Sequence, residues 1–222
     1  CIMDVVLLIP LFLSLFVTLF SIPFWIKRAK RVGLAGKDMH KNSSELVAEA
    51  GGVSVIVGFM VGVLSYIAIK TFYFKSKDNL IEIFASLSVI LIITFIGFVD
   101  DITGWKIGLN KKTRILFLFL ASIPLIVINA GESNVFGIEL GLIYPLVLIP
   151  LGIIGASTTF NFLAGYNSLE TSQGMLILSA LSIITFTSGE KWLTVIVLCM
   201  IASLFSFYIF NKHPAKVFPG DI

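Results

Sequence analysis

The sequence predicts an all-α protein, a polytopic bundle of transmembrane helices. Of the 222 residues, 57% are hydrophobic and only 13% are charged, about half the charged share of a soluble domain. The mean hydropathy of +1.01 leaves too few polar residues to cover a water-exposed surface. The apolar residues lie in long continuous runs without alternation, which argues against a β-barrel. The same composition excludes a disordered chain, a disulfide scaffold and an ordinary soluble globule.

Seven stretches without Asp, Glu, Lys or Arg are expected to cross the membrane: 5–26, 50–69, 83–99, 115–131, 140–169, 171–189 and 192–211. A helix needs about 20 apolar residues to cross the roughly 30 Å hydrocarbon core. The first stretch is too long for the apolar part of a signal peptide and has no basic segment before it, so we expect a true span. The fifth exceeds one span, and its helix is expected to end near residue 160, where a polar, uncharged segment begins.

The basic residues of the loops predict the orientation. With seven spans, 12 of the 16 Lys and Arg residues fall on one side of the membrane, and the other side holds only Lys70, Lys75, Lys77 and Lys191. The positive-inside rule makes the side with 12 basic residues cytoplasmic. The N-terminal residues are then outside and the C-terminal residues inside. We expect residues 1–222 to form a single transmembrane catalytic domain.

Two of the predicted cytoplasmic segments carry unusual charged groups. The first holds Asp38, Lys41 and Glu49; a solvated basic loop or an anchor for anionic lipids explains its basic residues equally well. The second places Asp100 and Asp101 directly after an apolar helix, where the helix dipole disfavours negative charge. These carboxylates require compensation from a cation or from nearby lysines, and a close pair suits proton transfer or metal binding. The alternative is a simple helix end at the membrane interface.

Two further segments offer hard oxygen ligands. Asn161, Asn167 and Glu170 lie in the polar segment after the fifth span, where they suit Mg²⁺ or simple hydrogen bonding between helices. Asp221 ends a Pro-Gly turn, and taken alone it is a common turn residue. Taken together, carboxylates, amides and lysines on one membrane face are what the transfer of a phosphate group needs. A metal and lysines neutralise the phosphates, and a carboxylate manages a proton.

Three motifs in this order resemble the polyprenyl-phosphate N-acetylhexosamine-1-phosphate transferases: GFVDDITGWK at 97–106, FNFLAGYNSLETSQG at 160–174 and VFPGD at 217–221. The family includes the bacterial phospho-N-acetylmuramoyl-pentapeptide transferase and the eukaryotic and archaeal GlcNAc-1-phosphate transferases. Ala164 and Asn167 stand where the bacterial loop has acidic residues, so this chain is more similar to the eukaryotic and archaeal form. That form implies transfer of GlcNAc-1-phosphate from UDP-GlcNAc to dolichyl phosphate, with release of UMP, as the first step of lipid-linked glycan assembly.

The resemblance implies a role for each candidate residue. The ligands of Mg²⁺, or of Mn²⁺, are Asn161 and Asp221. The catalytic positions are an acidic pair and a phosphate-binding lysine whose place stays open between two neighbours: Asp100, Asp101, Lys111 and Lys112. The substrate-binding residues lie near the uridine, the donor or the lipid phosphate: Asp38, Lys41, Glu49, Asn167 and Glu170. The chain departs from the family pattern at Thr158, where the family has Asn, and at Ser168, where it has Gly.

The expected partners are UDP-GlcNAc, a polyprenyl or dolichyl phosphate and the membrane, with no nucleic acid and with a homodimer left open. The active site is expected to face the cytoplasm, from the cell membrane of a prokaryote or the endoplasmic reticulum of a eukaryote. The family has about ten spans and this chain about seven. We therefore expect the chain to be incomplete at its C-terminus.

Other functions stay open at this point. A transporter or lipid flippase shares the span count, but it would bury polar residues near the middle of the bilayer, whereas these acids lie at span ends. A related transferase would use another UDP-N-acetylhexosamine and undecaprenyl phosphate. A noncatalytic assembly subunit is a third possibility. A CDP-alcohol transferase is disfavoured because its D-G-x-x-A-R pattern is absent from the sequence.

Overall fold

The structure is a computed structural model that describes residues 6–37, 46–103, 108–135, 137–162 and 165–221, without the side chains of 161 and 162. The chain forms two compact units. The terminal unit comprises Cys1–Asp78 and Gly165–Asp221, and the central unit comprises Asn79–Ala164. This division leaves the prediction of a single catalytic domain untested, and each unit is described by itself.

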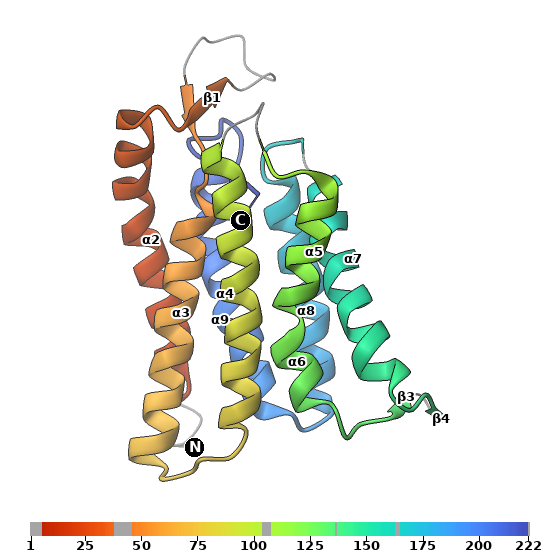
Figure 1. The fold of residues 1–222 in the computed structure, drawn as a ribbon. Coiled ribbons are helices and arrows are strands. Elements are labelled where there is room, and N and C mark those ends of the chain that lie inside the picture. The colour runs from red at the N-terminus through yellow and green to blue at the C-terminus, as the bar shows by residue number, and fades with distance from the viewer. Residues whose placement is uncertain (1–5, 38–45, 104–107, 136, 163–164, 222) are drawn as a thin grey trace. The chain divides into compact units, whose positions relative to one another are not determined.

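The terminal unit is built from long apolar helices. It contains α2 (Leu8–Arg31), α3 (Gly52–Ala68), α8 (Leu169–Thr187) and α9 (Lys191–Asn211), with a π-helical turn η1 (Ile69–Tyr73) extending α3. Helix α9 packs against α2, α3 and α8, and α2 packs along α3 (Figure 1). Ile22, Val55 and Phe207 are buried where α2, α3 and α9 meet.

Small residues bring α2 and α3 close together. A Cβ atom added at Gly58 would lie 2.7 Å from the Ser14 carbonyl oxygen, and one at Gly62 would lie 2.8 Å from the Pro10 carbonyl oxygen. Thr18, which faces Gly58, donates its hydroxyl to the Ser14 carbonyl at 2.8 Å. Small residues four apart are a common way for membrane helices to approach closely. This packing holds α3 in place, and the first turn of α3 carries part of the candidate site.

A small hairpin lies between α2 and α3 in the sequence. Strand β1 (Ala35–Lys37) pairs antiparallel with β2 (Leu46–Ala48). Val217, near the end of the chain, forms a parallel bridge with Ala48. The hairpin therefore accepts the C-terminal segment as an additional short strand.

The central unit contains α4 (Leu80–Thr103), α5 (Lys111–Ala121), α6 (Ile123–Ile128) and α7 (Ile149–Phe162), with a π-helical turn η2 (Tyr144–Leu148) before α7. Helices α5 and α6 pack against α4, and α7 packs against α5 and α6. A hairpin of β3 (Asn134–Val135) and β4 (Ile138–Glu139) lies between α6 and η2. Ile96, Leu118 and Ala121 form the buried cluster of this unit.

The predicted all-α membrane bundle is confirmed. Among the described residues, five helices are long and apolar enough to span a membrane: Leu8–Arg31, Gly52–Tyr73, Leu80–Thr103, Leu169–Thr187 and Lys191–Asn211. They match the first, second, third, sixth and seventh predicted spans. The fourth predicted span falls on α5 and α6, and the fifth falls on η2 and α7; these helices are shorter.

The break in the fourth predicted span has a local cause. Helix α5 ends at Ala121 and α6 begins at Ile123, with Pro124 in the first turn of α6. Proline has no backbone N–H to donate to the preceding turn, so it interrupts a continuous helix. The fifth span behaves as expected at its other end, because α7 ends at Phe162, close to the predicted residue 160.

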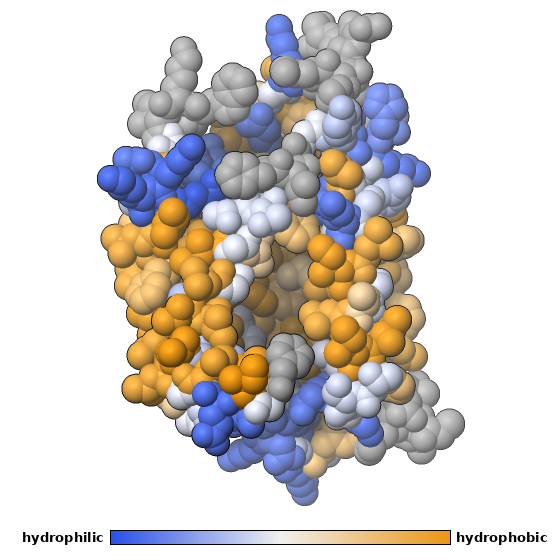
Figure 2. Space-filling view, turned by 90° about the vertical axis from the view of Figure 1, so that its right-hand side faces the viewer, coloured by the Kyte–Doolittle hydropathy of each residue, from blue (hydrophilic) through white to orange (hydrophobic). Residues whose placement is uncertain are grey.

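The surface of the helices agrees with a membrane setting. Apolar residues cover the middle of the face seen in Figure 2, and polar residues gather toward its two ends. On α2 an exposed stripe of phenylalanines runs along the helix, 47% to 74% exposed: Phe12, Phe16, Phe20 and Phe24. Such a stripe on a soluble protein would be an aggregation hazard, whereas lipid chains cover it in a bilayer.

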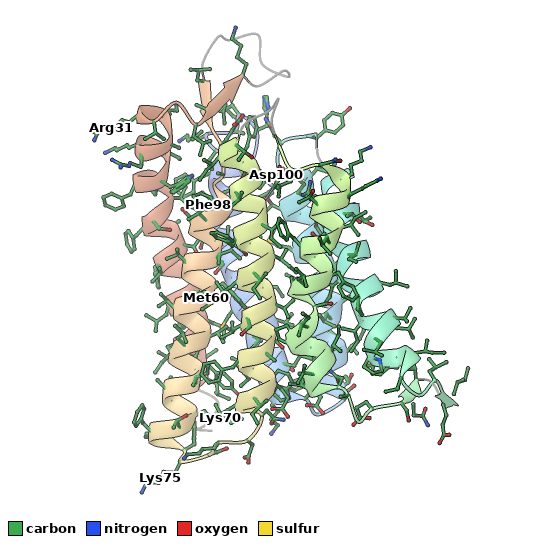
Figure 3. All side chains as sticks on the ribbon, in the orientation of Figure 1. Arg31, Met60, Lys70, Lys75, Phe98 and Asp100 are labelled. Atoms are coloured by element: carbon green, nitrogen blue, oxygen red, sulfur yellow. The ribbon has the colours of Figure 1, made fainter. Side chains whose placement is uncertain are left out.

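Basic residues mark the two ends of the terminal unit. Arg31 lies at the end of α2, and Lys70 and Lys75 lie at the opposite end of the unit, beyond α3 (Figure 3). The last turn of α2 also holds Arg28 and Lys30. The terminal unit therefore carries, at its opposite ends, basic residues that the prediction assigns to opposite sides of the membrane.

Candidate active site

The C-terminal segment 217–221 is fixed to the start of α3 in the terminal unit. Three backbone hydrogen bonds of 2.7 to 2.9 Å hold it: Phe218 N–H to the Ala48 carbonyl, Gly51 N–H to the Phe218 carbonyl and Gly52 N–H to the Pro219 carbonyl. The segment thus continues the β1–β2 hairpin and passes over the first turn of α3. The position of Asp221 follows from these contacts.

Two glycines allow this close approach. A Cβ atom at Gly51 would lie 2.8 Å from the ring of Phe207 and would overlap the side chain of Val217. Gly220 has a φ of 81°, in the left-handed region that glycine adopts without steric cost. The Gly51-Gly52 pair and the Pro219-Gly220 turn, far apart in the sequence, are therefore parts of one local structure.

A buried amide joins this segment to α8. Asn211 is the last residue of α9, and it is 2% exposed. Its Nδ2 donates to the Val217 carbonyl at 2.9 Å, and its Oδ1 accepts the Thr171 hydroxyl at 2.9 Å. Thr171, which is 3% exposed, directly follows Glu170. One side chain therefore connects the neighbour of Glu170 to the segment that carries Asp221.

Oxygen ligands gather at this place in the terminal unit. The carboxyl groups of Glu170 and Asp221 lie close enough to interact electrostatically. Glu170 lies in the first turn of α8, a position that favours a carboxylate. The Asn167 amide nitrogen lies 3.4 Å from Nδ1 of His213. The two carboxylates offer hard oxygen donors of the kind that fits Mg²⁺.

The described residues contain no group of three or more His, Cys, Asp or Glu side chains able to hold a metal ion. A cation at Asp221 would therefore need further oxygen ligands from amide side chains, water or a bound substrate. Mg²⁺ commonly binds in this way, through one or two protein carboxylates, with water and substrate phosphates filling the other positions.

Glu49 lies beside the β1–β2 hairpin of the terminal unit. The indole N–H of Trp25 donates to the Glu49 carbonyl at 3.0 Å, and the Glu49 N–H donates to the Leu34 carbonyl at 3.1 Å. The Glu49 side chain covers Gly36, where any Cβ atom would overlap Oε1. Burial raises the pKa of the Glu49 carboxyl above its ordinary value, because desolvation disfavours the charged form.

In the central unit, Asp100 joins the end of α4 to the start of α5. Its Oδ1 accepts the Leu109 N–H at 2.6 Å, and its Oδ2 lies 3.4 Å from Nη1 of Arg114. The Asp100 side chain is 10% exposed, and Figure 3 shows it at the end of α4. The expected charge compensation for the acidic pair therefore comes, for Asp100, from an arginine and a backbone N–H.

The other central candidates lie next to this junction. Asp101 follows Asp100 on α4 and is half-buried, whereas Lys111 and Lys112 are exposed in the first turn of α5. A lysine at a helix N-terminus adds positive charge to the positive end of the helix dipole. The two together favour an anion. Both lysines meet this condition, so the choice between them stays open.

The structure brings some predicted residues together and leaves others undescribed. Within the terminal unit, Glu170 and Asp221 lie close together, with Asn167 just before α8. Within the central unit, Asp100 lies against the start of α5. Asn161 belongs to the last turn of α7, but its side chain lies outside the described residues, as do Asp38 and Lys41.

Sequence reasoning missed four residues that contact the candidate residues or their neighbours within one unit: Arg114 in the central unit, and Thr171, Asn211 and His213 in the terminal unit. A signal existed for two of them. Arg114 is one turn after Lys111 on the same helix, where a cation faces the preceding loop. Asn211 is a polar residue that ends an otherwise apolar span, and a buried amide at such a point needs hydrogen-bond partners.

Long apolar helices with acidic and amide groups at their ends define an integral membrane protein with a polar site at the helix ends. A family model described as glycosyl transferase family 4 matches residues 83–222. The chain belongs to this family, and the resemblance stated from its motifs is confirmed.

Individual relatives agree with this assignment. Proteins of Saccharolobus solfataricus and Sulfolobus acidocaldarius, which carry the inferred name UDP-N-acetylglucosamine–dolichyl-phosphate N-acetylglucosaminephosphotransferase, are each 32% identical over 223 residues. These matches cover 97% of this chain and 66% of each relative. A phospho-N-acetylmuramoyl-pentapeptide-transferase of Streptococcus pyogenes is 28% identical over 230 residues, covering 97% of this chain and 68% of the relative.

Proposed function

We propose that this protein transfers GlcNAc-1-phosphate from UDP-GlcNAc to a polyprenyl phosphate such as dolichyl phosphate. An oxygen of the lipid phosphate attacks the β-phosphorus of the donor, the bond to the bridging oxygen breaks, and UMP leaves with the electron pair. The products are UMP and a GlcNAc-pyrophosphoryl lipid. The observation that carries this proposal is the clustering of Glu170 and Asp221 at the end of apolar helices, in a chain with 32% identity to proteins named for this reaction.

Mg²⁺, or Mn²⁺, is the proposed cofactor. Asp221 and Asn161 would hold it, and the donor pyrophosphate would complete its coordination. A divalent cation supplies charge neutralisation for the pyrophosphate, and it would also relieve the repulsion between Glu170 and Asp221. The hard oxygen donors at this place support the choice of metal.

In the central unit, Lys111 or Lys112 is the proposed partner of the lipid phosphate. Both carboxylate oxygens of Asp100 already have partners in Leu109 and Arg114. We therefore assign Asp100 the task of holding α5, and Asp101 the task of orienting the lipid phosphate or accepting its proton.

In the terminal unit, Asn167 and Glu170 are the proposed contacts on the uridine side of the donor. Glu49, with Asp38 and Lys41, is assigned to the donor or to the lipid phosphate. We place the active site on the cytoplasmic side, because 12 of the 16 basic residues fall on that side and the positive-inside rule assigns such a side to the cytoplasm.

The test is an assay of UMP release by the complete purified protein with UDP-GlcNAc, dolichyl phosphate and Mg²⁺. We expect release to require the lipid and to stop when EDTA removes the metal. The variants Asp100→Asn, Asn161→Ala and Asp221→Asn are each expected to lose turnover. If all three kept full turnover, the site assignment would be wrong.

The Streptococcus relative favours a second candidate of the same chemistry, with another UDP-N-acetylhexosamine and undecaprenyl phosphate as substrates. The same assay decides between them when UDP-GlcNAc is exchanged for UDP-N-acetylmuramoyl-pentapeptide and dolichyl phosphate for undecaprenyl phosphate. We expect UDP-GlcNAc to give the faster release of UMP, because Ala164 and Asn167 replace the acidic residues of the bacterial loop.

A further inference from the structure

We propose that Asn211 is a positioning residue that sets where Asp221 lies relative to the first turn of α8. The inference rests on the proposed function, in which Asp221 is a metal ligand. Asn211, Thr171 and the 217–221 segment all belong to the terminal unit, so their contacts are part of one compact body.

The hydrogen bonds of Asn211 use both ends of its amide. The amide nitrogen donates to the Val217 carbonyl and the amide oxygen accepts the Thr171 hydroxyl, both at 2.9 Å and both buried. A carboxylate cannot donate, and an alkyl side chain can neither donate nor accept. Asparagine is therefore suited to this place by its pair of complementary groups and its length.

The chain forms a closed loop between the end of α9 and the 217–221 segment. Lys216 N–H donates to the Phe210 carbonyl at 2.9 Å, and Val217 is fully buried. The Asn211 bond to the Val217 carbonyl closes the same loop from inside. Two independent sets of contacts thus hold the segment: this loop, and the backbone bonds from Gly51 and Gly52.

The contacts of Asn211 lead to both acids. Thr171 is covalently next to Glu170, and Val217 begins the segment that ends in Asp221. Loss of Asn211 would leave the Thr171 hydroxyl and the Val217 carbonyl buried without this partner, which is costly. The 217–221 segment would then shift or open to satisfy them, and the spacing between Glu170 and Asp221 would change.

The same pair of helices offers a matched control. Thr194 of α9 donates its hydroxyl to the Thr185 hydroxyl of α8 at 3.0 Å, and these residues are 8% and 5% exposed. This hydrogen bond lies at the opposite ends of α8 and α9 from the Asn211 bond. Thr194→Val therefore removes a comparably buried bond between the same helices, away from the candidate site.

The first experiment is hydrogen–deuterium exchange of the complete protein in nanodiscs. The Gly51 and Gly52 amides, which donate to the 217–219 segment, report its attachment to α3. We expect Asn211→Leu and the milder Thr171→Val to speed their exchange by about 10-fold. Thr194→Val is expected to leave exchange at Gly51 and Gly52 unchanged. Equal exchange in the wild type and both site variants would overturn the proposal.

The second experiment measures Mn²⁺ binding to the same proteins by electron paramagnetic resonance. We expect Asn211→Leu to raise the Mn²⁺ dissociation constant by about 10-fold, and Thr194→Val to leave it unchanged. If Asn211 had a purely structural role, Asn211→Leu and Thr194→Val would both lower the thermal stability and would leave the Mn²⁺ affinity unchanged. Faster exchange with wild-type Mn²⁺ affinity would therefore contradict the link to Asp221.

The two readouts separate this inference from the proposed function. If the wild-type protein bound no Mn²⁺, the metal assignment would fail, while amide exchange would still decide whether Asn211 holds the 217–221 segment. Asn211→Asp, measured at a pH where the aspartate is ionised, sharpens the result, because a carboxylate keeps an acceptor for Thr171 but cannot donate to Val217. We expect it to match Asn211→Leu in the exchange of Gly51 and Gly52.

Discussion

The terminal and central units hold their acidic residues in opposite ways. In the terminal unit, Glu170 and Asp221 are placed through their neighbours: Thr171 bonds to Asn211, and the 217–219 segment bonds to α3. In the central unit, Asp100 is placed through its own carboxylate, which takes the Leu109 N–H and lies beside Arg114. These terminal-unit contacts belong to the neighbours of Glu170 and Asp221, whereas the contacts of Asp100 belong to its own carboxylate.

This difference separates ligand-binding acids from structural ones. Where the contacts of neighbouring residues fix the backbone, replacing the acid leaves those anchoring contacts in place. An acid that makes the structural contact itself cannot leave it without breaking a helix junction. We therefore expect activity and stability to respond independently in the terminal unit and together in the central unit.

The largest expected effect is on activity, at Asp221. Asp221→Asn keeps the size of the side chain but removes the charge that the metal requires. Turnover is expected to fall by about 100- to 1000-fold, measured as UMP release, while the melting temperature in detergent stays at the wild-type value. A matching loss of thermal stability would place Asp221 among the structural acids and remove the contrast between the units.

The backbone that places Asp221 is expected to be the next most sensitive element. Gly51→Ala puts a methyl group 2.8 Å from Phe207 and 3.0 Å from the Phe218 carbonyl, and overpacking of this kind costs about 1–3 kcal/mol. Gly152→Ala on α7 is the control, because its Cβ would meet open space. Thermal unfolding should show a lower melting temperature for Gly51→Ala alone, and similar values for both variants would contradict the close approach.

Most of this terminal-unit arrangement could not be predicted from the sequence. The motif containing Asp221 was visible, but its pairing with Gly51 and Gly52 joins segments more than 160 residues apart, and local patterns carry no information on such pairing. The spans were predictable because hydrophobic length alone selects them. Arg114 was counted only as a loop charge, since periodicity does not show that its side chain reaches back to Asp100.

Arg114 tests the central unit. Arg114→Leu removes the cation beside a carboxylate that is 10% exposed, and we expect a loss of about 1–3 kcal/mol in the free energy of unfolding. Turnover should fall with it, because α5 carries Lys111 and Lys112. Lys112→Gln is the control on the same helix turn, with unchanged stability. If Arg114→Leu lowered turnover but not stability, Arg114 would belong with the substrate-binding residues instead.

Glu49 makes the stability of the terminal unit depend on pH. Burial raises the pKa of the Glu49 carboxyl above its ordinary value of 4.5. The neutral carboxyl therefore favours the folded state below that ordinary value, and this stabilisation is lost as the pH rises through the raised pKa of the folded state. Glu49→Gln removes this titration. The melting temperature of Glu49→Gln relative to wild type is therefore expected to rise between pH 4 and pH 8. A flat or falling difference would show that the carboxylate is well solvated.

The smallest expected effect concerns Ser168, the residue just before α8, which has a φ of 63°. A left-handed conformation costs a non-glycine residue about 1–2 kcal/mol, part of which glycine returns as entropy of the unfolded chain. Ser168→Gly is therefore expected to stabilise the protein by about 0.5–1 kcal/mol, seen as a higher melting temperature. Gly220→Ala, at a φ of 81°, makes the opposite change in the same unit and should lower it.

Ser168 also sharpens the contrast between the two units, because it lies between Asn167 and Glu170 and its side chain makes no capping hydrogen bond to α8. If acids in the terminal unit are placed by backbone, relief of strain at Ser168 should leave the Mg²⁺ dependence of UMP release as it is, even as the melting temperature rises. A change in Mg²⁺ dependence would show that the strained turn itself sets the position of Glu170, and that the buried amide of Asn211 shares this task with the turn before α8.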